Sequence, residues 1–227
     1  MPRKSETPKP PRRVQAPKQR AAERTPDERR TWRALIVVGA LGFLGLAVAL
    51  GVILFGGSES AAATLKDAGC TVQTYTSQGQ AHVQQLPKGF KYNSFPPTTG
   101  PHNPVPAPYD FYEQPVEELR LVHNLEHGGI VVQYGSEVPQ EQRDRIAAWW
   151  RDDPNGIVVA SLPALKKTIA LAAWTAQYRG SDPSPQDQQG VLAKCPAFDE
   201  GAFDAFVDEY GFHGPERFDR IMLAPGT

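Results

Sequence analysis

Residues 121–134 read LVHNLEHGGIVVQY and contain a change of pattern from helix to strand. The first part continues an apolar stripe at helical spacing, which consists of Val116, Leu119, Val122 and Leu125. Pro115 suits the first turn of such a helix, and Gly128 suits its C-terminal end. The β-branched run IVVQY at 130–134 then predicts a buried strand. The segment therefore predicts a helix from Pro115 to Gly128 that leads directly into a strand.

Two of the five histidines of the chain, His123 and His127, lie four residues apart in this segment, with Glu126 beside the second. On a helix, the two imidazoles would project from one face, close enough to bind the same metal ion. On a strand, they would lie about 13 Å apart, which is too far for a shared ion. The capping residues agree with the apolar stripe, so we favour the helix, on which a metal site can form.

The spacing H-x-x-E-H is the reversed form of the zinc-peptidase motif, in which two imidazoles bind the metal and the carboxylate acts as general base on its water. We therefore predict that His123 and His127 bind zinc or copper, the ions that neutral imidazoles suit. A metal site needs at least one further protein ligand. The candidates are His102, His82 and His213. Glu126 would orient a ligand or, in a metal-dependent hydrolase, serve as the catalytic base.

A purely structural role for the histidines is the alternative. They can hydrogen-bond to backbone and carboxylate groups and so hold a neighbouring loop against the domain, as in a non-catalytic structural or interaction module of the cell envelope. The chain contains no serine-nucleophile elbow, phosphate-binding loop, dinucleotide fingerprint or CxxC pair, which excludes several common classes of enzyme. Whether the protein is an enzyme stays open at this point.

The neighbouring loop is the proline-rich segment 92–115, YNSFPPTTGPHNPVPAPYDFYEQP. Its prolines exclude both a helix and an interior strand. Loops of this length in compact domains are usually functional or disordered. The loop also carries five aromatic residues, Tyr92, Phe95, Tyr109, Phe111 and Tyr112. These large side chains indicate that the loop packs against the domain.

Two further helices and two further strands are predicted in the second half of the chain. One helix follows Pro139 and ends before Pro154, and the other follows Asp199 as its N-cap. The runs GIVVAS at 156–161 and KTIALAAW at 167–174 predict strands that are buried on both faces. The strands are too few for a large parallel sheet, so we expect a compact single α+β domain.

The apolar run at 34–55 carries no charge and is long enough to cross a bilayer as one helix. Residues 1–33 contain 11 Lys and Arg against 4 Asp and Glu, a net charge of +7, so the rest of the chain carries −8 of the total of −1. The positive-inside rule places this tail in the cytoplasm and the rest outside. A cleaved signal peptide is the alternative, but its apolar core normally spans only about 7–15 residues.

We therefore expect four parts in the chain. Residues 1–33 would be a disordered basic cytoplasmic tail, 34–55 a single transmembrane helix, 56–63 a short flexible linker and 64–227 an extracytoplasmic domain. The expected location is the cytoplasmic membrane, with the lipid bilayer as partner and anionic lipid headgroups as an additional contact of the basic tail. We expect no nucleic-acid partner, and the sequence identifies no protein partner.

The two cysteines, Cys70 and Cys195, both follow the apolar run and lie near opposite ends of the predicted domain. In an oxidising compartment they can pair, and we favour a disulfide over two buried free thiols. Because the bridge would close a loop of more than 100 residues, chain entropy allows it to stabilise the fold by about 4–5 kcal/mol.

Four segments together resemble the bacterial domain-of-unknown-function family numbered 3105. They are PPTTGPH at 96–102, LVHNLEHGGIVVQY at 121–134, IALAAW at 169–174 and GPE at 214–216. The resemblance covers about residues 68–218 and implies an extracytoplasmic domain behind one N-terminal membrane segment, with no established activity. By position, the histidines of the family motifs correspond to His82, His102, His123 and His127, with Glu126 beside the last.

Overall fold

The computed structural model describes residues 60–178 and 183–227 of the chain. The predicted basic tail 1–33, the predicted membrane helix 34–55 and residues 56–59 of the predicted linker 56–63 lie outside the described residues. Within the described ranges, no helix has the length and apolar character that a membrane crossing requires.

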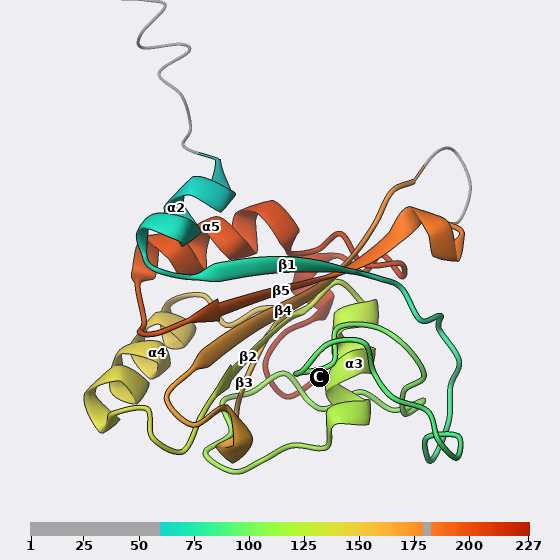
Figure 1. Ribbon diagram of the computed structural model, residues 1–227, viewed down its shortest axis with the longest axis horizontal. Coiled ribbons are helices and arrows are strands. Elements are labelled where there is room, and N and C mark those ends of the chain that lie inside the picture. Colours follow the sequence, from blue (N-terminus) through green and yellow to red (C-terminus); the bar gives the residue numbers. More distant parts are fainter. Residues whose placement is uncertain (1–59, 179–182) are drawn as a thin grey trace, which may run out of the picture. The chain divides into compact units, whose positions relative to one another are not determined.

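A five-stranded mixed sheet forms the centre of the domain (Figure 1). Its strand order is β1 (Thr71–Thr76), β5 (Gln188–Cys195), β4 (Ile169–Ala176), β2 (Ile130–Tyr134) and β3 (Ile157–Ser161). β2 and β3 pair in parallel, and the other neighbours pair antiparallel. With helices on both faces of this sheet, the α+β class expected from the sequence is confirmed.

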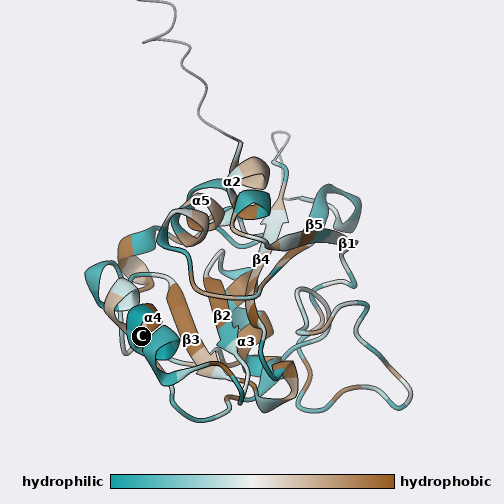
Figure 2. Ribbon diagram, turned by 60° about the vertical axis from the view of Figure 1, so that its left-hand side comes forward, coloured by the Kyte–Doolittle hydropathy of each residue, from teal (hydrophilic) through white to brown (hydrophobic). Residues whose placement is uncertain are grey.

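Alternate residues of the central strands belong to two different cores, one on each face of the sheet. Helices α2 (Ala61–Asp67), α4 (Gln140–Asp152) and α5 (Glu200–Tyr210) pack on one face, and α3 (Glu118–Glu126) packs on the other with the proline-rich loop. Figure 2 shows β2 and β3 as strongly hydrophobic between more hydrophilic helices. This double burial explains why these strands are continuous apolar runs instead of alternating ones.

Within the described residues, the structure confirms the three helices and three strands that the sequence predicts, with small shifts of their ends. α5 begins after Asp199, whose carboxylate accepts a hydrogen bond from the Ala202 backbone N–H at 2.9 Å. α3 ends as predicted, because Gly128 adopts a φ of +85° that favours glycine. Its start differs from the prediction: the first helical residue is Glu118, three residues after Pro115.

One α-helix and two strands of the described residues were not predicted. α2 begins at Ala61, so residues 61–63 of the predicted linker are the first helical turn, and Ser60 accepts the capping bond from the Ala63 N–H. β1 is mostly exposed at the edge of the sheet, and β5 contains a glycine and a lysine within its apolar run. None of the three shows the periodicity by which a sequence predicts helices or strands.

The proline-rich loop packs against the domain as its aromatic residues predict. Thr98, Thr99 and His102 are fully buried, and the Gln78 backbone N–H donates to the Thr99 hydroxyl at 3.1 Å. Nearer α3, the Asn124 side chain bonds both backbone groups of Ala107, at 2.8 and 3.1 Å. These bonds fix the loop between the segment that follows β1 and α3.

The predicted disulfide is present between Cys70 and Cys195, which are separated by 125 residues in sequence. It lies where β1 begins and β5 ends, next to the pair Thr71–Lys194 of the two strands. The bond therefore holds the exposed edge strand and α2, which precedes it, to the rest of the sheet.

Replacing both cysteines by alanine should lower the free energy of unfolding by about 2–5 kcal/mol, because the bridge restricts the unfolded chain. Denaturant titration of the full-length protein checks this value. Reductant should cause a similar loss in the unaltered protein and none in the double variant. A double variant as stable as the oxidised protein would contradict the expectation.

A second prediction concerns Gly190 in β5, where an added Cβ would collide with the side chain of Thr98. Gly190→Ala should lower the free energy of unfolding by about 1–3 kcal/mol, because the tightly packed loop must move. Gly201→Ala is the matched control, since its Cβ would meet nothing closer than 3.6 Å. Equal stability of the two variants in denaturant titrations would show that the loop does not pack tightly on β5.

Candidate metal centre

The C-terminal half of α3 places three polar side chains on one face of the helix. His123, Glu126 and the capping residue His127 are spaced at i, i+3 and i+4, so they point to the same side. The Glu126 carboxylate is 1% exposed and His123 is 5% exposed, although both are polar. The helical form of this segment, on which the predicted metal site depended, is confirmed.

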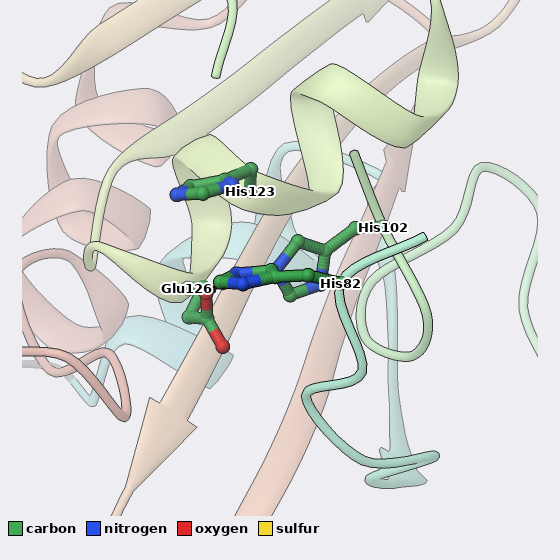
Figure 3. A group of neighbouring side chains, drawn as sticks. All are labelled: His82, His102, His123 and Glu126. Atoms are coloured by element: carbon green, nitrogen blue, oxygen red, sulfur yellow. Dashed lines mark hydrogen bonds and ion pairs between the residues drawn. The ribbon is translucent and has the colours of Figure 1, made fainter. Parts of the chain in front are cut away.

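Two loop histidines meet this face from the opposite side. His102 comes from the proline-rich loop, and His82 lies beside it in a short parallel bridge. The bridge is made by the Val83 N–H, which donates to the His102 carbonyl at 2.7 Å, and by the His102 N–H, which donates to the Ala81 carbonyl at 3.0 Å. Figure 3 shows His82 and His102 next to Glu126, with His123 on the neighbouring turn of the helix.

Four donor atoms converge in this cluster, one each from His82, His102, His123 and Glu126. All of them lie within 4.8 Å of one another, and no other such group occurs among the described residues. Glu126 Oε2 is 2.9 Å from His102 Nε2 and 3.4 Å from His82 Nε2. Tetrahedral zinc with bonds of about 2.0–2.1 Å needs donors about 3.3 Å apart. To reach this spacing, donors up to 4.8 Å apart would move closer together, and the pair at 2.9 Å would move slightly apart.

Backbone carbonyls fix the orientation of two of the imidazoles. His102 Nδ1 lies 2.8 Å from the Gly100 carbonyl, and His123 Nδ1 lies 2.6 Å from the Asn103 carbonyl. A carbonyl only accepts, so both Nδ1 atoms carry hydrogen, and in the neutral form of each ring the lone pair is on Nε2. A hydrogen bond of this kind on the second nitrogen is typical of histidines that bind metals.

The short contact between His102 Nε2 and Glu126 Oε2 requires a proton or a metal cation between the two atoms. An imidazole lone pair and a carboxylate lone pair cannot face each other at 2.9 Å without a proton or a cation between them. The carboxylate favours such a partner, because it is buried and negatively charged. The geometry of this pair is thus suited either to a charged histidine or to a bound metal ion.

The environment of Glu126 keeps it ionised. Burial alone would raise the pKa of this carboxyl, but the hydrogen bond and charge of His102, the hydrogen bond from Gln80 and the nearby His123 together lower the pKa below its ordinary value. Gln80 Nε2 donates to the second carboxylate oxygen, Oε1, at 3.0 Å. In turn, Gln80 Oε1 accepts a bond from the buried Gln188 at 2.8 Å.

His127 lies next to the cluster but outside the group of four. Its Nε2 is 2.9 Å from His123 Nε2 and 3.3 Å from the Glu216 carboxylate, and its ring packs on Phe218 with 4.2 Å between ring centroids. The pKa of His127 is lowered to about 4, first by burial and then by the neighbouring His123. The pKa of His123 is lowered as well, mainly by burial.

The structure thus brings together three of the four predicted histidine ligands, with Glu126 among them. The fourth, His127, lies beside this group, and the additional candidate His213 is exposed on the surface and outside it. Sequence reasoning did not identify Gln80 or Glu216. The GPE motif that contains Glu216 was the only signal for either residue, and the Glu216 backbone N–H donates to the Glu126 carbonyl at 3.0 Å.

A cleft of about 450 Å³ adjoins the cluster. Its lining residues are Gln80, Tyr178, Pro183, Pro215, Glu216 and Arg217. Gln80 and Glu216 connect it to the cluster, since one bonds to Glu126 and the other contacts His127. Glu126 and His102 themselves are inaccessible to solvent, whereas the side chain of His82 is 46% exposed.

Comparison with known proteins identifies the family. Residues 82–217 match the model of the family described as Protein of unknown function (DUF3105), so the chain belongs to this family. Comparisons with curated proteins and with solved structures give no match. The matched range begins at His82 and includes all four residues of the cluster.

The lowered pKa of His127 predicts an acid-sensitive fold. Between about pH 6.5 and about pH 4, the unfolded chain binds a proton at this residue that the folded chain does not. The free energy of unfolding should therefore fall as the pH decreases through this interval, and His127→Phe should weaken that dependence. Denaturant titrations at several pH values, with chelator present, measure both slopes. Equal slopes for the two proteins would contradict this assignment.

Proposed function

We propose that this protein binds a transition-metal ion, zinc or copper, through His82, His102, His123 and Glu126. The observation that carries the proposal is the convergence of four donors, with His102 and His123 held by backbone carbonyls so that their Nε2 atoms are available. Three neutral imidazoles and one carboxylate suit either ion. This ligand set keeps His82, His102 and His123 of the sequence-based hypothesis and replaces His127 with Glu126.

Glu126 fits the role of a ligand better than that of a catalytic base. Its carboxylate is 1% exposed, and its two oxygens face Gln80 and the loop histidines. A general base in a hydrolase needs a water or substrate within hydrogen-bond reach. The hydrolase stays an alternative that Glu126→Gln can test: as a base, Glu126 is dispensable for metal binding, whereas as a ligand it is required.

The location of the domain is also part of the proposal. We infer that the apolar run 34–55 anchors the chain in the cytoplasmic membrane, that the basic tail contacts anionic lipid headgroups inside, and that the domain lies outside. The charge of residues 1–33 and the apolar run support this topology. The disulfide Cys70–Cys195 agrees with an oxidising compartment.

The full-length protein should bind one Zn²⁺ or Cu²⁺ ion per chain and release protons as it does so, because the metal displaces the proton between His102 and Glu126. His102→Ala combined with His123→Ala should weaken binding by more than the roughly 10- to 100-fold typical of outer-shell changes. Calorimetry in buffers of different ionisation enthalpy measures affinity and proton release together.

His213→Ala is the matched control, since it removes an exposed histidine outside the cluster. Its metal affinity should equal that of the unaltered protein. Equal metal content in the unaltered protein and in the double variant would remove the proposed function. A thermal unfolding curve that ignores both metal and chelator would favour the alternative, in which the histidines only hold the proline-rich loop in place.

A further inference from the structure

His127 and Glu216 connect the four-donor cluster to the adjoining cleft. His127 Nε2 lies 2.9 Å from His123 Nε2 on one side and 3.3 Å from the Glu216 carboxylate on the other. The exposed fraction of the side chains rises along this path, from 1% for Glu126 to 14% for His127 and 43% for Glu216. Glu216 is the one carboxylate among the described residues that line the cleft.

We propose that His127 and Glu216 bind the metal ion transiently as it passes between the cleft and the buried cluster. We call this pair of residues the transfer station. This inference rests on the proposed function and adds a route to it. Glu216 would bind the cation first, from the cleft. His127 would then replace Glu216 as a ligand, and His123 would bind the ion next. The ion would then reach the four permanent donors without losing all of its ligands at any step.

The distances allow such an exchange of ligands one at a time. Two nitrogens that bind one tetrahedral ion at about 2 Å lie about 3.3 Å apart, and His123 Nε2 and His127 Nε2 are 2.9 Å apart. The ion can therefore bind His127 before it leaves Glu126 and His82. A stepwise route matters because a bare divalent ion in a buried, weakly polar site is very costly in free energy.

His127 also differs from the fixed histidines in a way that suits transfer. Among the described residues, no backbone carbonyl accepts a hydrogen bond from its Nδ1, in contrast to His102 and His123. When the ion binds to Nε2, the ring proton can move to Nδ1 by exchange with solvent. Phe218 packs on the ring and keeps it between His123 and Glu216.

The competing route passes directly over His82, whose side chain is 46% exposed and 3.4 Å from Glu126. An ion that enters there meets a permanent ligand first and does not need His127. The two routes make different predictions for variants of His127 and Glu216. Such variants should slow metal exchange if the ion passes through the transfer station, and should leave the rate unchanged if it enters over His82.

The test measures rates of metal exchange in the full-length protein with Co²⁺ alone as the probe, because its visible absorption reports coordination. Stopped-flow mixing gives the binding rate, and a chase with excess chelator gives the release rate. His127→Phe keeps a ring against Phe218 but removes the donor atoms, and Glu216→Gln keeps the shape but removes the charge. His213→Ala serves as the control, and circular dichroism verifies that each variant is folded.

We expect His127→Phe to slow binding and release by about tenfold each, which corresponds to a barrier increase of roughly 1.4 kcal/mol. The equilibrium affinity should change little, since both rates fall together. Glu216→Gln should mainly slow binding, and His213→Ala should change neither rate. This pattern supports the station.

Three other outcomes would contradict the transfer station, and each would do so in a different way. Unchanged rates in both His127→Phe and Glu216→Gln would assign entry to the His82 route, with the proposed metal site intact. Faster release and weaker affinity in His127→Phe would make His127 a permanent ligand and not a transfer residue. Absence of Co²⁺ binding to the unaltered protein, together with absence of Zn²⁺ and Cu²⁺ binding, would remove the proposed function and the station with it.

Discussion

The buried carboxylate of Glu126 is the constraint on which the site and its surroundings depend. An ionised carboxylate that is 1% exposed is stable only if nearby groups compensate for its lost hydration. Here the compensation comes from chain segments far apart in sequence, through Gln80, His82 and His102, while the Glu126 backbone carbonyl accepts from the Glu216 N–H. The charge therefore fixes the relative positions of α3, the proline-rich loop and two further loops.

A metal ion would complete this arrangement instead of disturbing it. The loop histidine His102 and the helix histidine His123 are both oriented by carbonyls, so their Nε2 atoms already point into the cluster before any ion binds. One carboxylate and three neutral imidazoles would leave a divalent ion with one remaining positive charge. That charge is compatible with a partly exposed site, and the solvent-facing His82 provides the exposure. The same contacts also hold the loop to α3, so structure and proposed function rely on one set of bonds.

The sequence predicted the strands that are buried on both faces and the helices that have clear capping residues. β2, β3 and β4 are continuous apolar runs, and α3 combines an apolar stripe with Gly128 at its end. It could not predict β1, because an exposed edge strand needs no apolar alternation and is defined by pairing with β5 over a distance of more than 100 residues. α2 looked like a linker, since its three alanines follow a polar segment, and only Leu65 is fully buried.

For the site, helical spacing placed His123, Glu126 and His127 on one face, as observed. Spacing alone could not show that His102 and His82 reach this face, because their positions depend on the path of an irregular loop and on one short bridge. It also paired His123 with His127 as ligands; their Nε2 atoms do lie 2.9 Å apart, but His127 also contacts Glu216 and Phe218 and lies outside the group of four. The difference arises because the GPE segment lies against the end of α3, a long-range contact without a local pattern.

The most direct test of the metal centre is anomalous diffraction at the zinc absorption edge from crystals of the full-length protein grown with Zn²⁺. The account predicts an anomalous peak about 2.0–2.2 Å from His102 Nε2 and a Glu126 carboxylate oxygen, with His82 and His123 completing the coordination. A cluster that shows no peak while zinc occupies other positions on the same molecule would contradict it.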